Sequence, residues 1–133
     1  MTISLVIPAY NEARYLGECL ACAVKQQASL AEIIVVNNAS TDETALIAHR
    51  FPGVQVIDEP VKGLTHARER GRREARGDII AYIDADTHMS LGWVETVEAV
   101  FTADPRVVCV SGPYRYYDAS RFSRLLGWLY WRV

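Results

Sequence analysis

The chain opens with the stretch ISLVIPAYNE, which occupies residues 3–12. Residues 3–7 are mostly apolar and rich in β-branched side chains, and Pro8 ends the run, so the pattern predicts a buried strand. Polar residues follow at once in positions 10–12. A buried strand that leads directly into a polar loop is the unit from which the rest of the chain is built.

The same unit recurs along the sequence. Largely apolar segments predict further strands at residues 33–36, 54–57, 78–83 and 107–110. Helical periodicity and capping residues predict the intervening helices at residues 12–27, 40–50, 65–76 and 91–103. Asn11 is the expected N-cap of the first helix, and Ser40 with Glu43 forms the expected capping box of the second. This alternation predicts an α/β fold, a mostly parallel sheet with helices on both faces.

Composition narrows the class of protein. The chain has 133 residues, of which 50% are hydrophobic and 23% charged, and its net charge is -2. These values are ordinary for a soluble domain, and the absence of a long basic tract argues against nucleic acid as a partner. Three cysteines predict reduced thiols and a cytoplasmic location. We expect neither a signal peptide nor a membrane span, because no basic start and no run of about 18 apolar residues occurs.

Polar residues gather after the predicted strands, in the loops 8–12, 37–40, 58–59 and 84–86. In open α/β sheets a ligand lies outside the carboxyl ends of the strands, where the strand order reverses, so a binding crevice is expected there. The first loop lacks the Gly-x-Gly-x-x-Gly pattern, and no P-loop pattern occurs. A dinucleotide redox cofactor and P-loop NTPase chemistry are therefore not expected.

The pair Asp84 and Asp86 carries the clearest chemistry. Residues two apart at the end of an extended segment project toward the same side. Their hard carboxylate oxygens suit Mg²⁺ or Mn²⁺, and two protein ligands leave coordination positions for diphosphate oxygens. Such a metal would neutralise charge on a departing diphosphate. The alternative interpretation of an Asp-x-Asp triplet is a solvated turn.

These segments together resemble family 2 glycosyltransferases of the GT-A fold, a Rossmann-like three-layer sandwich. The matching segments follow the family's order, at residues 5–12, 36–42, 62–63, 67–71, 77–80 and 84–87. The resemblance implies an enzyme that transfers a sugar, with inversion, from a nucleotide-diphosphate sugar to an acceptor that the sequence does not identify. A UDP-sugar is the favoured donor, and Mg²⁺ or Mn²⁺ is the implied cofactor.

The resemblance also implies roles for individual residues. It assigns the nucleoside to the first loop, through Pro8, Ala9, Tyr10 and Glu12, and the metal and diphosphate to Asp84, Ala85 and Asp86, with Asp86 the more direct metal ligand. Asn38 matches a position that often holds an aspartate that contacts uracil. The remaining donor-site matches are Ser40, Lys62 and Arg68. No catalytic base is identified, because the family's base usually lies further downstream.

We expect residues 1–115 to form the nucleotide-sugar-binding domain, with the acceptor-binding part truncated. Residues 116–133 form an amphipathic segment rich in Trp and Arg. Packing or homo-oligomer formation is favoured for residues 120–133 over peripheral contact with the inner face of the membrane. Three other functions stay open: a module that binds nucleotide sugar without transfer, an interaction protein that uses the aromatic segment, and a nucleotidyltransferase.

Several other residues invite a functional interpretation. Cys19 and Cys22 have Cys-x-x-Cys spacing, but we expect them to be small helix residues without a redox role. His88 is expected to be a loop histidine without a special role. A place for His66 in the donor site is considered but is not the favoured interpretation. The arginines of the helix at 65–76 are expected to face solvent, except Arg68, which lies in its first turns.

Overall fold

Four strands form one parallel sheet in the order β3-β2-β1-β4. The structure is a computed structural model, and it describes residues 1–112. The strands are β1 (Ile3–Ala9), β2 (Glu32–Asn37), β3 (Val54–Asp58) and β4 (Ile79–Tyr82). The chain divides into two compact units, residues 1–99 and residues 100–133, and the sheet belongs to the first.

β1 lies at the centre of the sheet, and every one of its residues is buried. Val6 pairs with Ile34 of β2 on one side and with Tyr82 of β4 on the other. The chain moves outward from β1 through β2 to β3 and then returns to the opposite side of β1 with β4. The strand order therefore reverses between β1 and β4, where a ligand crevice is expected.

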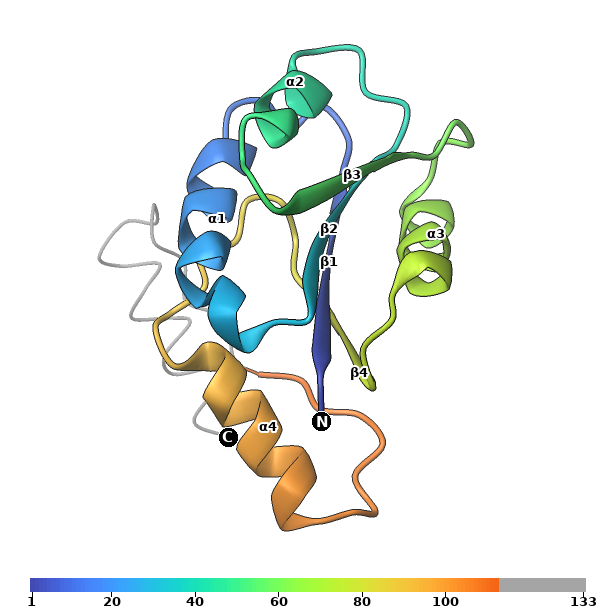
Figure 1. Cartoon of the computed structure of the whole chain (residues 1–133). Coiled ribbons are helices and arrows are strands. Elements are labelled where there is room, and N and C mark those ends of the chain that lie inside the picture. The colour runs from blue at the N-terminus through green and yellow to red at the C-terminus, as the bar shows by residue number, and fades with distance from the viewer. Residues whose placement is uncertain (113–133) are drawn as a thin grey trace, which may run out of the picture. The chain divides into compact units, whose positions relative to one another are not determined.

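Helices cover both faces of this sheet. The helices within residues 1–99 are α1 (Leu16–Ala23), the 3₁₀ helix η1 (Val24–Ser29), α2 (Thr44–His49) and α3 (Leu64–Glu74). A further helix, α4 (Trp93–Ala103), begins in this unit and ends in the second. Figure 1 shows α1 and α2 on one side of the strands and α3 on the other. The α/β three-layer architecture expected from the sequence is confirmed.

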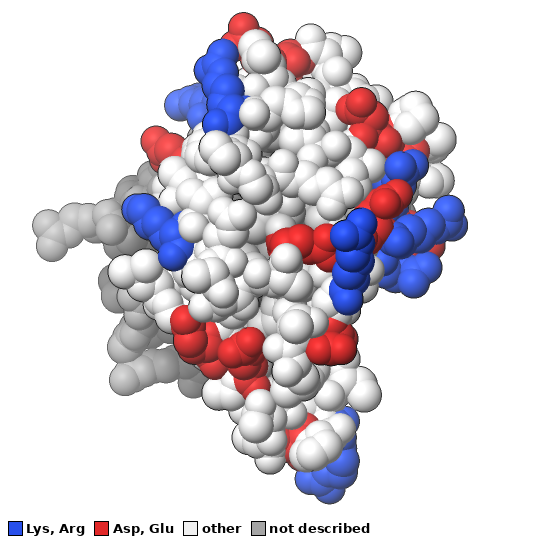
Figure 2. All heavy atoms as spheres, viewed as in Figure 1, with Lys and Arg blue, Asp and Glu red and all other residues white. Residues whose placement is uncertain are grey.

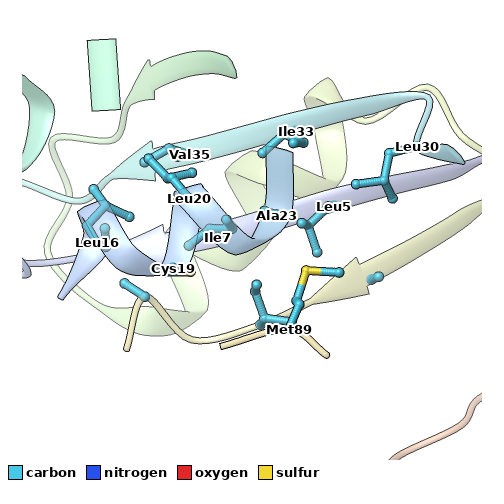
Figure 3. Packing of buried hydrophobic residues seen from close by; sticks show 14 of the residues in the cluster. Leu5, Ile7, Leu16, Cys19, Leu20, Ala23, Leu30, Ile33, Val35 and Met89 are labelled. Atoms are coloured by element: carbon cyan, nitrogen blue, oxygen red, sulfur yellow. The ribbon is translucent and has the colours of Figure 1, made fainter. Parts of the chain in front are cut away.

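Each face of the sheet has its own apolar core. Odd-numbered residues of β1, such as Leu5 and Ile7, pack with Leu16 and Leu20 of α1 (Figure 3). The even-numbered Val6 packs on the α3 side with Ile34 and Ala67, among others. Because side chains alternate between two buried faces along the strand, β1 is apolar on both faces apart from the buried Ser4.

The first helix begins later than the sequence predicts, at Leu16 instead of residue 12. Asn11 is not its N-cap, because its backbone adopts φ 54° and its side-chain oxygen accepts a hydrogen bond from the amide of Thr41. The expected capping box is also absent. The amide of Thr44, which begins α2, donates to Asp42 Oδ1 at 3.0 Å, while the hydroxyl of Ser40 accepts from the amide of Asn11.

The predicted strand at residues 107–110 does not form. These residues are in coil, and Val108 is 92% exposed. A β-branched sequence favours a strand only where a neighbouring strand offers hydrogen bonds and a surface to pack on, and the run Val107–Val110 has no such partner among the described residues. The segment 116–133, with its expected packing, oligomer or membrane contacts, lies outside the described residues. Within residues 1–112 no helix combines the length and apolar character that crossing a bilayer requires.

Candidate functional site

A cleft of about 480 Å³ opens at the carboxyl ends of the strands. Loops after all four strands contribute to it, together with the start of α3. Its lining residues are Pro8, Ala9, Tyr10, Glu12, Asn38, Lys62, Gly63, Leu64, Ala67, Asp84, Ala85 and Asp86. The structure therefore gathers the predicted site residues in one place, apart from Ser40 and Arg68, which lie outside the lining. Gly63, Leu64 and Ala67 were not assigned to the site: Gly63 and Ala67 fall in segments that match the family, but the resemblance gave none of the three a role, and their side chains carry no polar group that would indicate one.

The loop after β1 is held in place by the loop after β2. The amide of Glu12 donates to Thr44 Oγ1 at 2.8 Å, and the amide of Ala13 donates to Asp42 Oδ2 at 3.1 Å. The amide of Asn11 donates to the Ser40 hydroxyl, and the side-chain oxygen of Asn11 accepts from the amide of Thr41. Ser40 therefore holds the loop after β1 without itself lining the cleft. These bonds hold the loop after β1 against the loop after β2, and a turn in which the amides of Tyr15 and Leu16 both donate to the carbonyl of Glu12 leads into α1.

Tyr10 and Lys62 meet although they come from different loops. Lys62 Nζ donates to the Tyr10 hydroxyl at 2.5 Å and lies 3.9 Å from the centre of the Tyr10 ring. Both side chains line the cleft, and Tyr10 is 39% exposed. The contact places a cation against an aromatic face at the edge of the binding space.

Asn38 is only 3% exposed, although it also lines the cleft. Its side-chain nitrogen donates to the carbonyl oxygens of Glu59 at 3.1 Å and Val61 at 2.7 Å. Its side-chain oxygen accepts from the amide of Gly63 at 2.7 Å. The side chain expected to contact a base is therefore engaged by the loop between β3 and α3.

Three carboxylates line the cleft, those of Glu12, Asp84 and Asp86. Burial raises the pKa of Glu12, and the negative charges of Asp86, Asp42 and Asp84 raise it further. The region thus holds an excess of negative charge that a cation would relieve. Residues 1–112 contain no group of three or more His, Cys, Asp or Glu side chains arranged to hold a metal. A metal bound at Asp84 and Asp86 would therefore need further ligands from substrate or water, and their hard oxygens fit Mg²⁺ or Mn²⁺.

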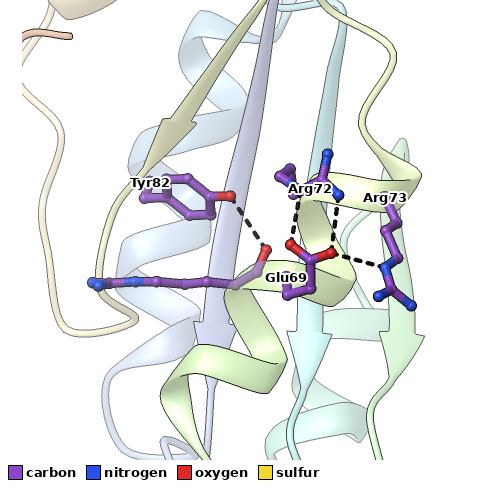
Figure 4. Close-up of polar contacts among 5 residues, drawn as sticks. Glu69, Arg72, Arg73 and Tyr82 are labelled. Carbon is purple, nitrogen blue, oxygen red and sulfur yellow. Dashed lines mark hydrogen bonds and ion pairs between the residues drawn. The ribbon is translucent and has the colours of Figure 1, made fainter.

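Arg68 reaches this acidic group from α3. Its guanidinium lies 3.6 Å from Asp84 Oδ1 and 5.8 Å from the centre of the Tyr82 ring. The Tyr82 hydroxyl donates to the main-chain oxygen of Arg68 at 3.2 Å, which ties α3 to the end of β4 (Figure 4). Arg68 therefore lies next to the cleft and supplies positive charge to one of its carboxylates.

The other arginines of α3 are engaged on its surface. Arg72 and Arg73 both donate to Glu69, and these hydrogen bonds lower the pKa of Glu69 to about 2 (Figure 4). Arg70 pairs with Glu74 at 3.1 Å. Figure 2 shows basic side chains interleaved with acidic ones on the side of the molecule that carries α3. The expectation of a solvated, charge-paired surface is met here.

The remaining candidates lie outside the cleft lining. Cys19 is buried in α1, and burial raises its pKa to about 12, so the thiol stays protonated near neutral pH and is a poor nucleophile. Cys22 lies on the same helix, half-buried. His88 Nε2 lies 3.2 Å from a carboxylate oxygen of Glu18, also on α1.

Comparison with known proteins adds to this geometry. The sequence model described as Glycosyl transferase family 2 matches residues 4–132. "Uncharacterized glycosyltransferase EpsJ" from Bacillus subtilis strain 168 is 34% identical over 92 residues, which cover 66% of this chain and 27% of EpsJ. "Glycosyltransferase GlyG" from Streptococcus pneumoniae serotype 4 is 35% identical over 124 residues, 89% of this chain and 40% of GlyG. The chain thus spans less than half the length of these relatives.

Two solved structures are similar in fold. S. aureus TarS 1-349 in complex with UDP-GlcNAc has a TM-score of 0.73 at 20% identity, over 90% of this chain and 39% of that one. Glucosyl-3-phosphoglycerate synthase from Mycobacterium tuberculosis, in complex with Mn²⁺, UDP and phosphoglyceric acid, has a TM-score of 0.59 at 29% identity. That match covers 65% of this chain and 34% of the synthase.

Proposed function

The chain belongs to glycosyl transferase family 2, and from that premise we propose that its cleft binds the nucleotide-diphosphate part of a sugar donor. The observation that carries this proposal is the meeting of Tyr10, Lys62, Asp84 and Asp86 in one cleft at the reversal of strand order. An aromatic ring suits a nucleoside, a cation suits a phosphate, and a pair of carboxylates suits a divalent metal.

Each group has a place in the proposed complex. Tyr10 offers an aromatic surface to the nucleoside, and Lys62 offers positive charge to the phosphates. Asp84 and Asp86 would hold Mn²⁺ or Mg²⁺, and such a metal, when bound, neutralises charge that develops on a departing diphosphate. Arg68, next to Asp84, adds a second positive charge close to the same point.

UDP is the favoured nucleotide in this proposal. The two structurally similar enzymes are described in complex with UDP-GlcNAc and with UDP and Mn²⁺, respectively. The synthase, at 29% identity, supports a uridine nucleotide site with a metal in this chain. TarS, at 20% identity, supports only the similarity of fold. Transfer with inversion of the sugar is the reaction that we propose for the whole protein.

Calorimetric titration tests the proposal. UDP, GDP and dTDP are each titrated with and without Mn²⁺ into the wild-type chain and into Asp84→Ala/Asp86→Ala. We expect wild type to bind UDP only weakly without the metal and at least tenfold more tightly with it, and we expect the double variant to lose this dependence. A matched control is Glu95→Ala/Glu98→Ala, which removes two carboxylates on α4 and should bind as wild type does. Equal heats for wild type and Asp84→Ala/Asp86→Ala, unchanged by Mn²⁺, would refute the proposal.

A further inference from the structure

The loop between β3 and α3, residues 59–63, delivers Lys62 and Gly63 to the cleft. It contains Pro60, which has no amide hydrogen, and Gly63, whose φ of 144° is accessible mainly to glycine. Residues 59–63 contain no hydrogen-bonded turn and no backbone hydrogen bond to one another, so the path of the loop depends on side chains and neighbouring segments.

Asn38 supplies most of those groups. The loop's carbonyls at Glu59 and Val61 and its amide at Gly63 all bind the Asn38 side chain, at 3.1, 2.7 and 2.7 Å. Two further hydrogen bonds involve main-chain amides of the loop: the amide of Glu59 donates to the main-chain oxygen of Asn37, and the amide of Val61 donates to the Glu59 side chain. Removing the Asn38 amide would leave three main-chain groups of one short loop without these partners.

The chemistry of this arrangement requires an amide. Two carbonyl oxygens face the nitrogen of Asn38, and an N–H faces its oxygen, so both ends of the side chain are matched in only one orientation. An ionised aspartate only accepts hydrogen bonds, and its charge would face the carbonyls of Glu59 and Val61. Because Asn38 is 3% exposed, water offers little compensation.

Lys62 is the residue that this loop positions for function. Among the described residues that line the cleft it is the only basic one, against the acidic Glu12, Asp84 and Asp86. Its contact with Tyr10 fixes its ammonium at the edge of the binding space. A shift of the loop would therefore remove positive charge from a site that, on the function proposed above, receives an anionic diphosphate.

We propose that Asn38 is a positioning residue that holds the 59–63 loop and acts on the nucleotide through Lys62, instead of reading the base itself. The proposal rests on the proposed function for the identity of the ligand. The hold on the loop exists without ligand and can be measured without it.

Hydrogen exchange on the ligand-free chain tests the hold. Asn38→Asp should speed exchange of the Gly63 amide at least tenfold, and by a larger factor than it speeds exchange in the buried strand β1, which reports only the loss of global stability. Gln27→Glu is the matched control, because it makes the same exchange of amide for carboxylate opposite a main-chain carbonyl, that of Gly53, outside the cleft. It should leave residues 59–63 unchanged. If Asn38→Asp does not fold, Asn38→Ala removes the same bonds without adding charge and is measured in its place. Wild-type exchange at Gly63 in the folded variant would overturn the proposal.

A double-mutant cycle tests the route through Lys62. UDP and GDP, each with Mn²⁺, are titrated into Asn38→Asp, Lys62→Met and the double variant. We expect Asn38→Asp to weaken both nucleotides by a similar factor, about tenfold, and the double variant to bind no more weakly than the weaker single variant. A change in the UDP-to-GDP ratio would show that Asn38 contacts the base directly. Fully additive losses would show that Asn38 acts independently of Lys62. Either result would overturn the proposal. A wild-type chain that binds neither nucleotide would refute the proposed function and the ligand part of this inference, while the exchange result would still decide whether Asn38 holds the loop.

Discussion

Arg68 and Asp84 form an exposed ion pair at the edge of the cleft, with N···O 3.6 Å and side chains 45% and 57% exposed. If Asp84 also binds a metal, the guanidinium and the metal compete for the same carboxylate. The other arginines of α3 discussed above pair with glutamates on the helix surface, so they offer matched comparisons. The guanidinium of Arg68 thus offsets part of the negative charge that Asp84 presents to a cation.

We therefore expect Arg68→Gln to raise affinity for Mn²⁺ alone, measured as free Mn²⁺ by electron paramagnetic resonance in the absence of nucleotide. The gain should be at most about fivefold, because an exposed ion pair is worth roughly 0.2–1 kcal/mol. Arg72→Gln, which removes a partner of Glu69 instead, is the control and should change nothing. Weaker Mn²⁺ binding by Arg68→Gln would contradict the competition and would indicate that the guanidinium orients Asp84 for the metal.

Position after a buried strand and the family resemblance together predicted most of the residues that line the cleft. Asp84 and Asp86 stand out from the residues alone, because a pair of carboxylates follows a buried strand, whereas Tyr10 and Lys62 received their roles only from the resemblance. The commitment of Asn38 could not be predicted in the same way. Its partners are main-chain groups of a loop more than 20 residues away in sequence, and their positions depend on the path of that loop.

Helix α3 packs tightly against the sheet at Gly71. A Cβ built there would lie 2.3 Å from Val6 Cγ1, closer than side chains tolerate, whereas a Cβ at Gly17 of α1 would lie 3.8 Å from its nearest neighbour, Ile47. Both glycines lie in helices, so replacing each by alanine brings the same gain in helix propensity. A difference between the two variants therefore reports the effect of packing.

This difference predicts opposite effects on the free energy of unfolding, measured by urea denaturation. Gly71→Ala should destabilise the fold by about 1–3 kcal/mol, because α3 must move away from Val6 to admit the methyl group. Gly17→Ala should stabilise it by about 0.5–1 kcal/mol, because alanine favours the helix and the site is open enough. A neutral Gly71→Ala variant would mean that α3 does not pack on β1 as closely as the structure places it.

The positions of helices and strands were predictable where a periodic pattern of apolar residues continued over many residues. They were less predictable where two loops bind each other. β1 to β4 and the ends of α4 and α3 follow from local patterns within a few residues. The start of α1 does not: residues 12–15 form a turn ahead of the helix, and its position depends on the hydrogen bonds from the amides of Glu12 and Ala13 to side chains of the distant segment 42–44. The run Val107–Val110 shows the converse case, strand-like residues without a neighbouring strand in the described part of the chain.

At the scale of the whole sheet, the site is a consequence of strand order. Parallel strands present all their carboxyl ends at one edge, and the reversal between β1 and β4 leaves the opening there. This explains why segments scattered between residues 8 and 86 meet in one cleft. The opposite edge, at the amino ends of the strands, is held together by hydrogen bonds. The amide of Thr2 donates to Asp78 Oδ2 at 2.8 Å, and the Ser4 hydroxyl donates to Glu32 Oε1 at 2.6 Å.

This separation of edges predicts how ligand binding spreads through the molecule. With UDP and Mn²⁺ bound, hydrogen exchange should slow together in the four loops at residues 8–12, 38–42, 59–63 and 84–87, because the ligand contacts or immobilises all of them. Exchange at residues 1–4 and 76–78, on the opposite edge, should stay unchanged, and Asp84→Ala/Asp86→Ala should show no slowing under the same conditions. Protection of a single loop would mean that the nucleotide lies on one surface segment, and equal protection at both edges would mean general stabilisation without a defined site; either result would contradict binding in the cleft.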